Sequence, residues 1–107
     1  MKRVVVTGLG AFSPLGHNLQ DTWNALVNGV SGAELITHFD TEKFKTKFAC
    51  EVKNYNPLDY FDRKEARKLD IYAKYALIAA EQAYQDAGLA DADHDKDRAG
   101  VIWASGI

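Results

Sequence analysis

The sequence predicts an α/β fold in which two buried strands are joined by a crossover connection. Three observations support this prediction. Residues 3–8 contain three consecutive valines, as in a strand buried on both faces, and residues 100–104 (GVIWA) have a similar apolar character. Between them, residues 70–87 form a helical pattern that is apolar almost all round, which is typical of a helix inside a protein.

The first strand leads into a glycine-rich loop and then a helix. Residues 8–17 contain three glycines and a proline, which mark a loop. Asn18, with Asp21 three residues later, resembles a capping box and predicts where the helix begins. The helix should run to about residue 28 and end at Gly29. Its inner face is expected to carry Trp23, Leu26 and Val27.

The middle of the chain is predicted to be mixed. Over residues 48–52, larger apolar side chains alternate with other residues, which favours a short, partly exposed strand. Residues 54–62 contain Pro57 and predict a loop or broken turn, and Asp62 is a suitable cap for a helical stretch that begins there.

The helix over residues 70–87 is the clearest element. Its polar side chains are confined to a narrow strip, and Gly88 ends it. Small side chains on the helix should let another helix approach closely, at Ala76, Ala80, Ala83 and Ala87. Residues 89–97 then form an acidic connector to the second buried strand.

Composition excludes several classes of protein. The chain has 107 residues, 47% of them hydrophobic, and a net charge of −2, so it favours neither nucleic acid nor an anionic membrane as a partner. Cys50 is the single cysteine, which excludes an intramolecular disulfide. No apolar run is long enough for a signal peptide or a bilayer span, and we therefore expect a cytoplasmic protein.

Length sets a further expectation. Two core strands and a helix that is apolar all round cannot bury one another within 107 residues. We therefore expect residues 1–107 to be an incomplete part of a larger α/β domain.

The opening loop does not fit a nucleotide site. A dinucleotide fold requires G-x-G-x-x-G after the strand, but position 13 is Ser13 and Pro14 removes a backbone N–H. The Gly-Lys-Ser/Thr of a P-loop is also missing. A tight turn between strand and helix is the better interpretation, with a nucleotide-binding domain kept as a distant alternative.

Segments along the whole chain resemble one known family. They are residues 4–16 (VVVTGLGAFSPLG), 22–23 (TW), 31–32 (SG), 38–40 (HFD), 46–49 (TKFA), 63–68 (RKEARK), 85–89 (QDAGL) and 105–107 (SGI). Together they resemble the beta-ketoacyl-acyl-carrier-protein synthases, condensing enzymes of the thiolase superfamily, and most closely the type II elongating synthases. The resemblance implies the thiolase-like layered α/β/α/β/α fold, of which this chain is the N-terminal portion.

The resemblance also implies a reaction. Such enzymes join an acyl thioester to malonyl-acyl carrier protein by decarboxylative Claisen condensation, using a cysteine nucleophile, two histidines and backbone N–H groups for the oxyanion. In the family these residues lie beyond position 107, so no catalytic residue is expected in this segment. Neither a cofactor nor a metal is implied. The expected partners are acyl- and malonyl-loaded acyl carrier protein and a second copy of the enzyme.

The thiol and imidazoles of this segment are not expected to be catalytic. Cys50 has Glu51 beside it, which disfavours a thiolate, and a semi-buried structural thiol is the better interpretation. The histidines His17, His38 and His94 lie in predicted loops without metal-ligand spacing.

Two places are predicted to have functional roles. Helical spacing puts Lys64, Arg67 and Lys68 on one face. Such a run usually indicates only a solvent-exposed basic face. The resemblance implies instead that this face is a docking site for the acidic carrier protein. Ile107 follows Ser-Gly where the family places its acyl-chain pocket near the dimer interface, so it is either a residue of that pocket or an ordinary core isoleucine. Trp103 and Ala104 stand where the family more often has small residues, which leaves the shape of that pocket open.

Two further alternatives remain. A non-catalytic partner subunit of the chain-length-factor type keeps the same fold without the nucleophile, and nothing before position 108 separates it from the enzyme. A free-standing module that docks carrier protein is the other alternative, and it would require the isolated chain to fold cooperatively.

Overall fold

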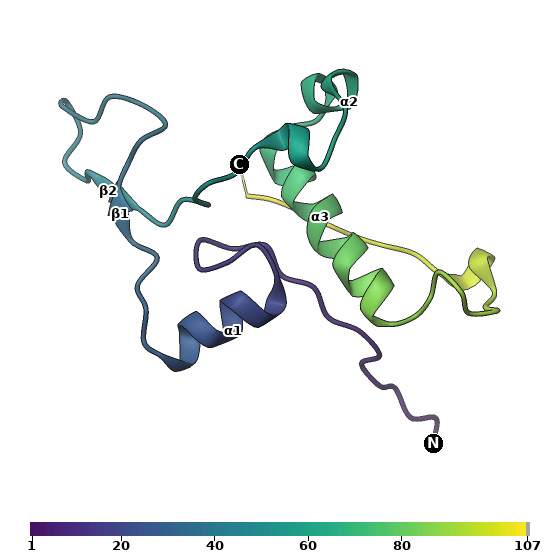
Figure 1. Cartoon of the computed structure of the whole chain (residues 1–107). Coiled ribbons are helices and arrows are strands. Elements are labelled where there is room, and N and C mark those ends of the chain that lie inside the picture. The colour runs from purple at the N-terminus through teal and green to yellow at the C-terminus, as the bar shows by residue number, and fades with distance from the viewer. Residues whose placement is uncertain (107) are drawn as a thin grey trace. The chain divides into compact units, whose positions relative to one another are not determined.

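The computed structural model describes residues 1–106. Its elements are, in order, α1 (Leu19–Val27), β1 (Glu34–Leu35), β2 (Phe48–Ala49), the 3₁₀ helix η1 (Pro57–Asp59), α2 (Arg63–Lys68), α3 (Ile71–Asp86) and the 3₁₀ helix η2 (Lys96–Arg98) (Figure 1). They fall into two compact units. The first contains Met1–Gly10 and the residues from Pro57 on, and the second contains Ala11–Asn56.

In the second unit, α1 begins and ends as predicted. The side-chain Oδ1 of Asn18 accepts a hydrogen bond from the backbone N–H of Asp21 at 2.8 Å, and its amide donates to the Asp21 carboxylate at 3.0 Å. This exchange satisfies one of the free N–H groups at the helix start. Gly29 ends the helix with a φ of 66°, which glycine adopts without a steric penalty. The predicted inner face of α1 is not covered in the described structure, as the absence of buried residues in α1 shows.

The second unit also contains a two-stranded antiparallel sheet. Its register pairs Glu34 with Ala49 and Leu35 with Phe48. The predicted strand over residues 48–52 is therefore confirmed only for its first two residues. Ala49 pairs with Glu34, the first residue of β1, so residues 50–52 have no residue of β1 opposite them.

In the first unit, α2 and α3 form close to their predicted positions. The Asp62 carboxylate accepts a hydrogen bond from the Glu65 N–H at 2.7 Å and so caps α2. Gly88 follows α3 with a φ of 67°. The buried residues of the described chain all lie on α3: Ala76, Ile78 and Ala79.

The small side chains of α3 allow another segment to pack closely against it. That segment is the glycine-containing opening loop, and not a second helix as predicted. The backbone of Gly8 and Gly10 lies against α3, so close that a Cβ atom at Gly8 would be 2.5 Å from the carbonyl oxygen of Ala83. A Cβ at Gly10 would overlap the carbonyl oxygen of Ala79. Gly8 and Gly10 therefore allow close packing between an extended segment and a helix.

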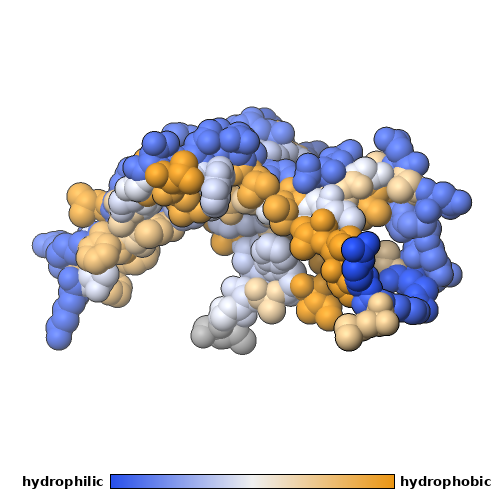
Figure 2. Space-filling view, turned by 90° about the horizontal axis from the view of Figure 1, so that it is seen from below, coloured by the Kyte–Doolittle hydropathy of each residue, from blue (hydrophilic) through white to orange (hydrophobic). Residues whose placement is uncertain are grey.

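The two predicted core strands are not formed in the described structure. Residues 3–8 and 100–104 have no hydrogen-bonded neighbouring strand there, and a strand exists only through such a neighbour. The side chains of Val4, Val5 and Val6 are accordingly 97%, 69% and 77% exposed. Hydrophobic side chains lie open on the face drawn in Figure 2. Within residues 1–106, no helix has both the length and the apolar character needed to cross a membrane.

Candidate functional site

The basic residues predicted for docking lie together on α2. Lys64, Arg67 and Lys68 are all exposed, and the helical spacing of Lys64 and Lys68 puts these two side chains one turn apart. The nearby carboxylate of Asp62 is engaged as the cap of α2. The local sequence therefore builds a short helix whose exposed surface is dominated by cations.

Arg67 also belongs to a groove that sequence reasoning missed. This α2–α3 groove has a volume of about 310 Å³, and its cations are Arg63 and Arg67 from α2 and Lys74 from α3. Its apolar lining comes from Pro57, Leu58 and Ala66. The spacing of Arg63 and Arg67, four residues apart, could have indicated that these two side chains share a face of α2. Lys74 gave no such signal, because it belonged to the polar strip of a helix predicted to be buried.

The groove is positive and its cations are not neutralised within the described chain. In residues 1–106, none of these three side chains forms an ion pair with a carboxylate. No acidic residue of the described chain lines the groove. Guanidinium groups bind carboxylates and phosphates through paired hydrogen bonds, so the groove has the chemistry of an anion-binding surface with an apolar floor.

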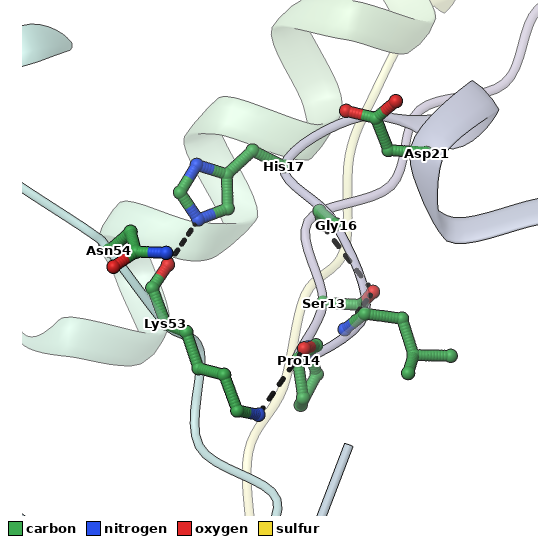
Figure 3. A pocket seen from close by; sticks show the side chains of 8 residues that line it. Ser13, Pro14, Gly16, His17, Asp21, Lys53 and Asn54 are labelled. Atoms are coloured by element: carbon green, nitrogen blue, oxygen red, sulfur yellow. Dashed lines mark hydrogen bonds between the residues drawn. The ribbon is translucent and has the colours of Figure 1, made fainter. Parts of the chain in front are cut away.

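The second unit contains a larger pocket around the turn at residues 13–16. Its volume is about 490 Å³ (Figure 3), and its lining residues are Ser13, Pro14, Leu15, Gly16, His17, Asp21, Lys53 and Asn54. The ammonium group of Lys53 donates to the carbonyl oxygens of Gly32 at 2.7 Å and Glu51 at 3.2 Å, with a long contact of 3.5 Å to that of Pro14. These carbonyl contacts occupy the ammonium group, which therefore ties three loops together.

Two other polar side chains of this pocket, those of His17 and Ser13, are also held in structural contacts. His17 stacks on Phe12 with ring centroids 4.8 Å apart, and its Nε2 donates to the carbonyl oxygen of Lys53 at 2.6 Å. The hydroxyl of Ser13 is 2.9 Å from that of Thr22. These contacts hold Ser13 and His17 on different partners, whereas acyl transfer requires a nucleophile hydrogen-bonded to its base.

The remaining candidate residues also have structural settings. Cys50 is exposed, which corrects the expectation of a semi-buried thiol, because the sheet ends at Ala49 and leaves the next side chain uncovered. His94 contacts the carbonyl oxygen of Ala92 through Nδ1 at 3.1 Å. Among residues 1–106, no three histidine, cysteine or acidic side chains are grouped to hold a metal ion.

Glu51 stands at the centre of a polar cluster in the second unit. Its carboxylate accepts hydrogen bonds from the N–H and hydroxyl of Thr37, the latter at 2.8 Å, and lies 3.7 Å from Nε2 of His38. Partial desolvation raises the pKa of Glu51, but the hydrogen bonds from Thr37 and His38, with the nearby imidazole, outweigh it. The pKa of Glu51 therefore lies below its ordinary value of 4.5.

Ile107, the other predicted site residue, lies outside the described residues. Upstream of it, Trp103 lines an apolar recess of about 280 Å³ with side chains of α3. The other residues of the recess are Tyr72, Ala73, Ala76, Leu77, Ala80 and Val101. Trp103 thus packs beside α3.

Comparison with protein families gives a match over residues 1–107 to the family described as "Beta-ketoacyl synthase, N-terminal domain". Among solved structures, "The ishigamide ketosynthase/chain length factor" matches with a TM-score of 0.70 and 37% sequence identity. That match covers 78% of this chain and 21% of the other. It confirms the predicted ketosynthase fold class.

Curated relatives agree with the family match. A "3-oxoacyl-[acyl-carrier-protein] synthase 2" from Staphylococcus aureus (strain N315) is 46% identical over 106 residues, and one from Coxiella burnetii is 43% identical over 106 residues. Each alignment covers 99% of this chain and 26% of the relative. The chain thus spans about a quarter of the length of these relatives.

Proposed function

This chain belongs to the beta-ketoacyl synthase N-terminal domain family. We therefore propose that it is part of a 3-oxoacyl-acyl-carrier-protein synthase that acts in fatty-acid chain elongation. The reaction is decarboxylative Claisen condensation of an acyl thioester with malonyl-acyl carrier protein. The observation that carries the proposal is the alignment with the Staphylococcus aureus synthase, which is 46% identical and leaves almost none of this chain unmatched. The opening loop agrees with this proposal, because Gly8 and Gly10 pack against α3, which gives these glycines a structural reason without a nucleotide.

We propose that this chain acts as the N-terminal part of a longer ketosynthase polypeptide, called the full enzyme from here on. Two observations support this. The relatives share their similarity with this chain over 26% of their length, and the apolar faces of α1 and of residues 3–8 have no cover in the described structure. The cysteine nucleophile and the two histidines of the condensation would belong to the remainder of the full enzyme.

The role proposed for α2 is to dock the acyl carrier protein. Lys64, Arg67 and Lys68 are exposed cations on one short helix, and within residues 1–106 none is paired with a carboxylate. An acidic carrier would meet them in solvent, where each pair contributes about 0.2–1 kcal/mol. Such a surface mainly accelerates encounter and gives a transient, salt-sensitive complex.

The condensation itself is tested by supplying the full enzyme with acyl- and malonyl-loaded carrier protein. We expect release of carbon dioxide and formation of a 3-oxoacyl-carrier thioester lengthened by two carbons. A chain-length-factor-type subunit is the second candidate, favoured by the likeness of this chain to the ishigamide ketosynthase/chain length factor. That alternative predicts no condensation by the purified protein alone and recovery of activity when a catalytic ketosynthase is added.

Ile107 is proposed to limit the acyl chain that the full enzyme accepts. The support is its position after Ser105 and Gly106, in the segment that resembles the acyl pocket of the family. Replacing Ile107 with phenylalanine would fill part of such a pocket, so Ile107→Phe should shorten the longest product. An unchanged product distribution would favour an ordinary packing role. Homodimerisation and a cytoplasmic location are further parts of this proposal.

A further inference from the structure

The C-terminal end of α1 contains an Asn-Gly pair, Asn28 and Gly29, that the proposed function does not use. The helix ends there in a Schellman motif. The N–H of Gly29 donates to the carbonyl oxygen of Leu26 at 3.1 Å, and the N–H of Val30 donates to that of Ala25 at 3.0 Å. The motif places a residue of positive φ just after the helix, and Gly29 has a φ of 66°. The Asn-Gly pair is thus positioned by the way in which α1 ends.

Both residues of this pair are open to solvent. Asn28 and Gly29 are exposed, and nothing lies within 4 Å of a Cβ atom placed on Gly29. The side-chain Nδ2 of Asn28 donates to the carbonyl oxygen of Asn24 at 2.8 Å. The side chain therefore lies back along the last turn of α1, held by an exposed hydrogen bond. Such bonds open readily, because helix ends fray.

An asparagine followed by glycine can react with the neighbouring backbone. The glycine nitrogen attacks Cγ of the asparagine, so that a C–N bond forms and the Cγ–Nδ2 bond breaks. Ammonia leaves with the proton of the attacking N–H, and a cyclic succinimide results. Glycine favours this step, because it has no Cβ atom to obstruct the ring. Water then opens the ring at either carbonyl carbon and yields aspartate or isoaspartate, without oxidation or reduction.

We propose that Asn28 is a site of spontaneous deamidation, with water as the only co-reactant. The folded helix end restrains the reaction, because the Gly29 N–H is bonded to Leu26 and the Asn28 amide is bonded to Asn24. Both hydrogen bonds open when the last turn of α1 frays. The rate of deamidation therefore depends on the stability of this turn.

The product weakens the helix end that restrained its formation. Aspartate at position 28 has no Nδ2 donor for the carbonyl oxygen of Asn24. It also places a negative charge where the macrodipole of α1 is already negative, and the last turn of α1 has no basic residue to compensate it. Isoaspartate in addition lengthens the backbone by one methylene group just before the Gly29 N–H. Deamidation of Asn28 therefore loosens the end of α1.

The first experiment incubates the purified full enzyme in isotopically labelled water and maps its peptides by mass spectrometry. Asn28 should be converted to aspartate and isoaspartate that carry a labelled oxygen from ring opening. Asn24 is the internal control, because it is exposed on the same helix but is followed by Ala25, and it should stay intact. An Asn28 that stays intact, or that converts no faster than Asn24, would overturn the proposal.

The second experiment tests the role of Gly29. Gly29→Ala should slow deamidation of Asn28, because the Cβ atom of alanine obstructs the attacking nitrogen. Alanine also tolerates a positive φ poorly, so the same substitution loosens the helix end. These two effects act on the rate in opposite directions. A faster reaction in Gly29→Ala would overturn ring closure onto the Gly29 nitrogen.

The third experiment tests the restraint by the last turn with two substitutions at one exposed position. Asn24→Ala and Asn24→Gly remove the same side chain and keep the carbonyl oxygen that accepts from Asn28. Glycine destabilises a helix relative to alanine, so Asn28 should react roughly five-fold faster in Asn24→Gly than in Asn24→Ala. Equal rates would overturn the restraint.

The consequence of deamidation is measured on the full enzyme with Asn28→Asp, which reproduces the charge of the product. Hydrogen exchange of the Gly29 and Val30 amides should accelerate roughly two- to five-fold. Asn18→Asp is the control, because it adds the same charge at the other end of α1, and it should leave these two amides unchanged. Unchanged exchange in Asn28→Asp would contradict the loosening of α1. None of these readouts depends on condensation, so the deamidation proposal and the proposed function fail separately.

Discussion

The backbone N–H of Leu9 donates a hydrogen bond to Oδ2 of Asp86 at 2.9 Å, linking two residues that are 77 positions apart. Gly8 and Gly10 flank Leu9, and both lie against the backbone of α3. The opening loop is therefore fastened to the C-terminal half of α3 by its small residues and by an N–H group. This arrangement explains the glycines without a bound phosphate.

Asp86 should accordingly stabilise the contact between the opening segment and α3. Asp86→Ala removes the acceptor of the Leu9 N–H, and we expect a loss of about 1–2 kcal/mol in the free energy of unfolding of the full enzyme. Hydrogen exchange of the Leu9 amide should accelerate. Asp91→Ala is the control, because the Asp91 side chain is exposed and takes no part in this hydrogen bond, and it should leave exchange at Leu9 unchanged. Equal exchange in both variants would contradict the role of Asp86.

Gly8 should tolerate no side chain. In Gly8→Ala the new Cβ atom would lie 2.5 Å from the Ala83 carbonyl oxygen, so the segment or the helix must move. We expect destabilisation by about 1–3 kcal/mol, measured by thermal or urea unfolding of the full enzyme. Gly100→Ala offers a matched comparison, since nothing lies within 4 Å of its added Cβ. It should change stability by less than about 0.5 kcal/mol.

Local signals in the sequence predicted the helices well. Asn18, Asp62, Gly29 and Gly88 mark helix ends through hydrogen bonds or backbone angles that depend on a few neighbouring residues. The strands were harder to predict, because a strand depends on a partner that can be distant in sequence. Residues 3–8 have strong strand character but no hydrogen-bonded neighbour in the described structure, while Glu34–Leu35 paired without a clear signal.

The candidate site was predicted only in part for a similar reason. Helical spacing within α2 was enough to group Lys64, Arg67 and Lys68. The α2–α3 groove depends on how α2 and α3 are placed, so the contribution of Lys74 could not be read from either helix alone. The pocket around the turn at residues 13–16 was not predicted for the same reason, since Lys53 reaches it from a loop that is 39 residues away from Pro14 in the sequence.

Lys53 should hold the loops of the second unit together. Lys53→Met keeps the apolar stem but removes the donor to the carbonyl oxygens of Gly32 and Glu51. We expect a cost of about 1–3 kcal/mol, because partly buried carbonyls lose a charged hydrogen-bond donor. Urea unfolding of the full enzyme measures this cost. Lys45→Met, at an exposed lysine, should have little effect, and equal stabilities would argue against the tethering role.

Glu51 makes the second unit sensitive to acid. Its pKa in the folded protein lies below the ordinary value of 4.5, so the folded state favours the carboxylate. The resulting stability is fully present above 4.5 and is lost as the pH falls through the folded pKa. The Thr37 amide resonance should therefore shift as the pH falls below 4.5. Glu51→Gln should abolish that titration and Glu42→Gln should retain it, while a Thr37 shift that persists in Glu51→Gln would assign it to another group.

The isolated chain of 107 residues should unfold with poor cooperativity. Of its described residues only Ala76, Ile78 and Ala79 are buried, which is too small a core for an all-or-none transition. Circular dichroism during a urea titration should show a broad, shallow change. A sharp sigmoidal transition would instead favour a free-standing binding module.

The docking role of α2 is tested most directly by the ratio of kcat/KM for a carrier-linked acyl substrate to that for a free thioester of the same acyl chain. This ratio is measured for the wild-type full enzyme and for the Lys64→Glu, Arg67→Glu double variant. Charge reversal should lower the ratio by roughly ten-fold or more at low salt, because only the carrier meets the basic surface. A variant that loses activity on both substrates equally, leaving the ratio unchanged, would contradict the account.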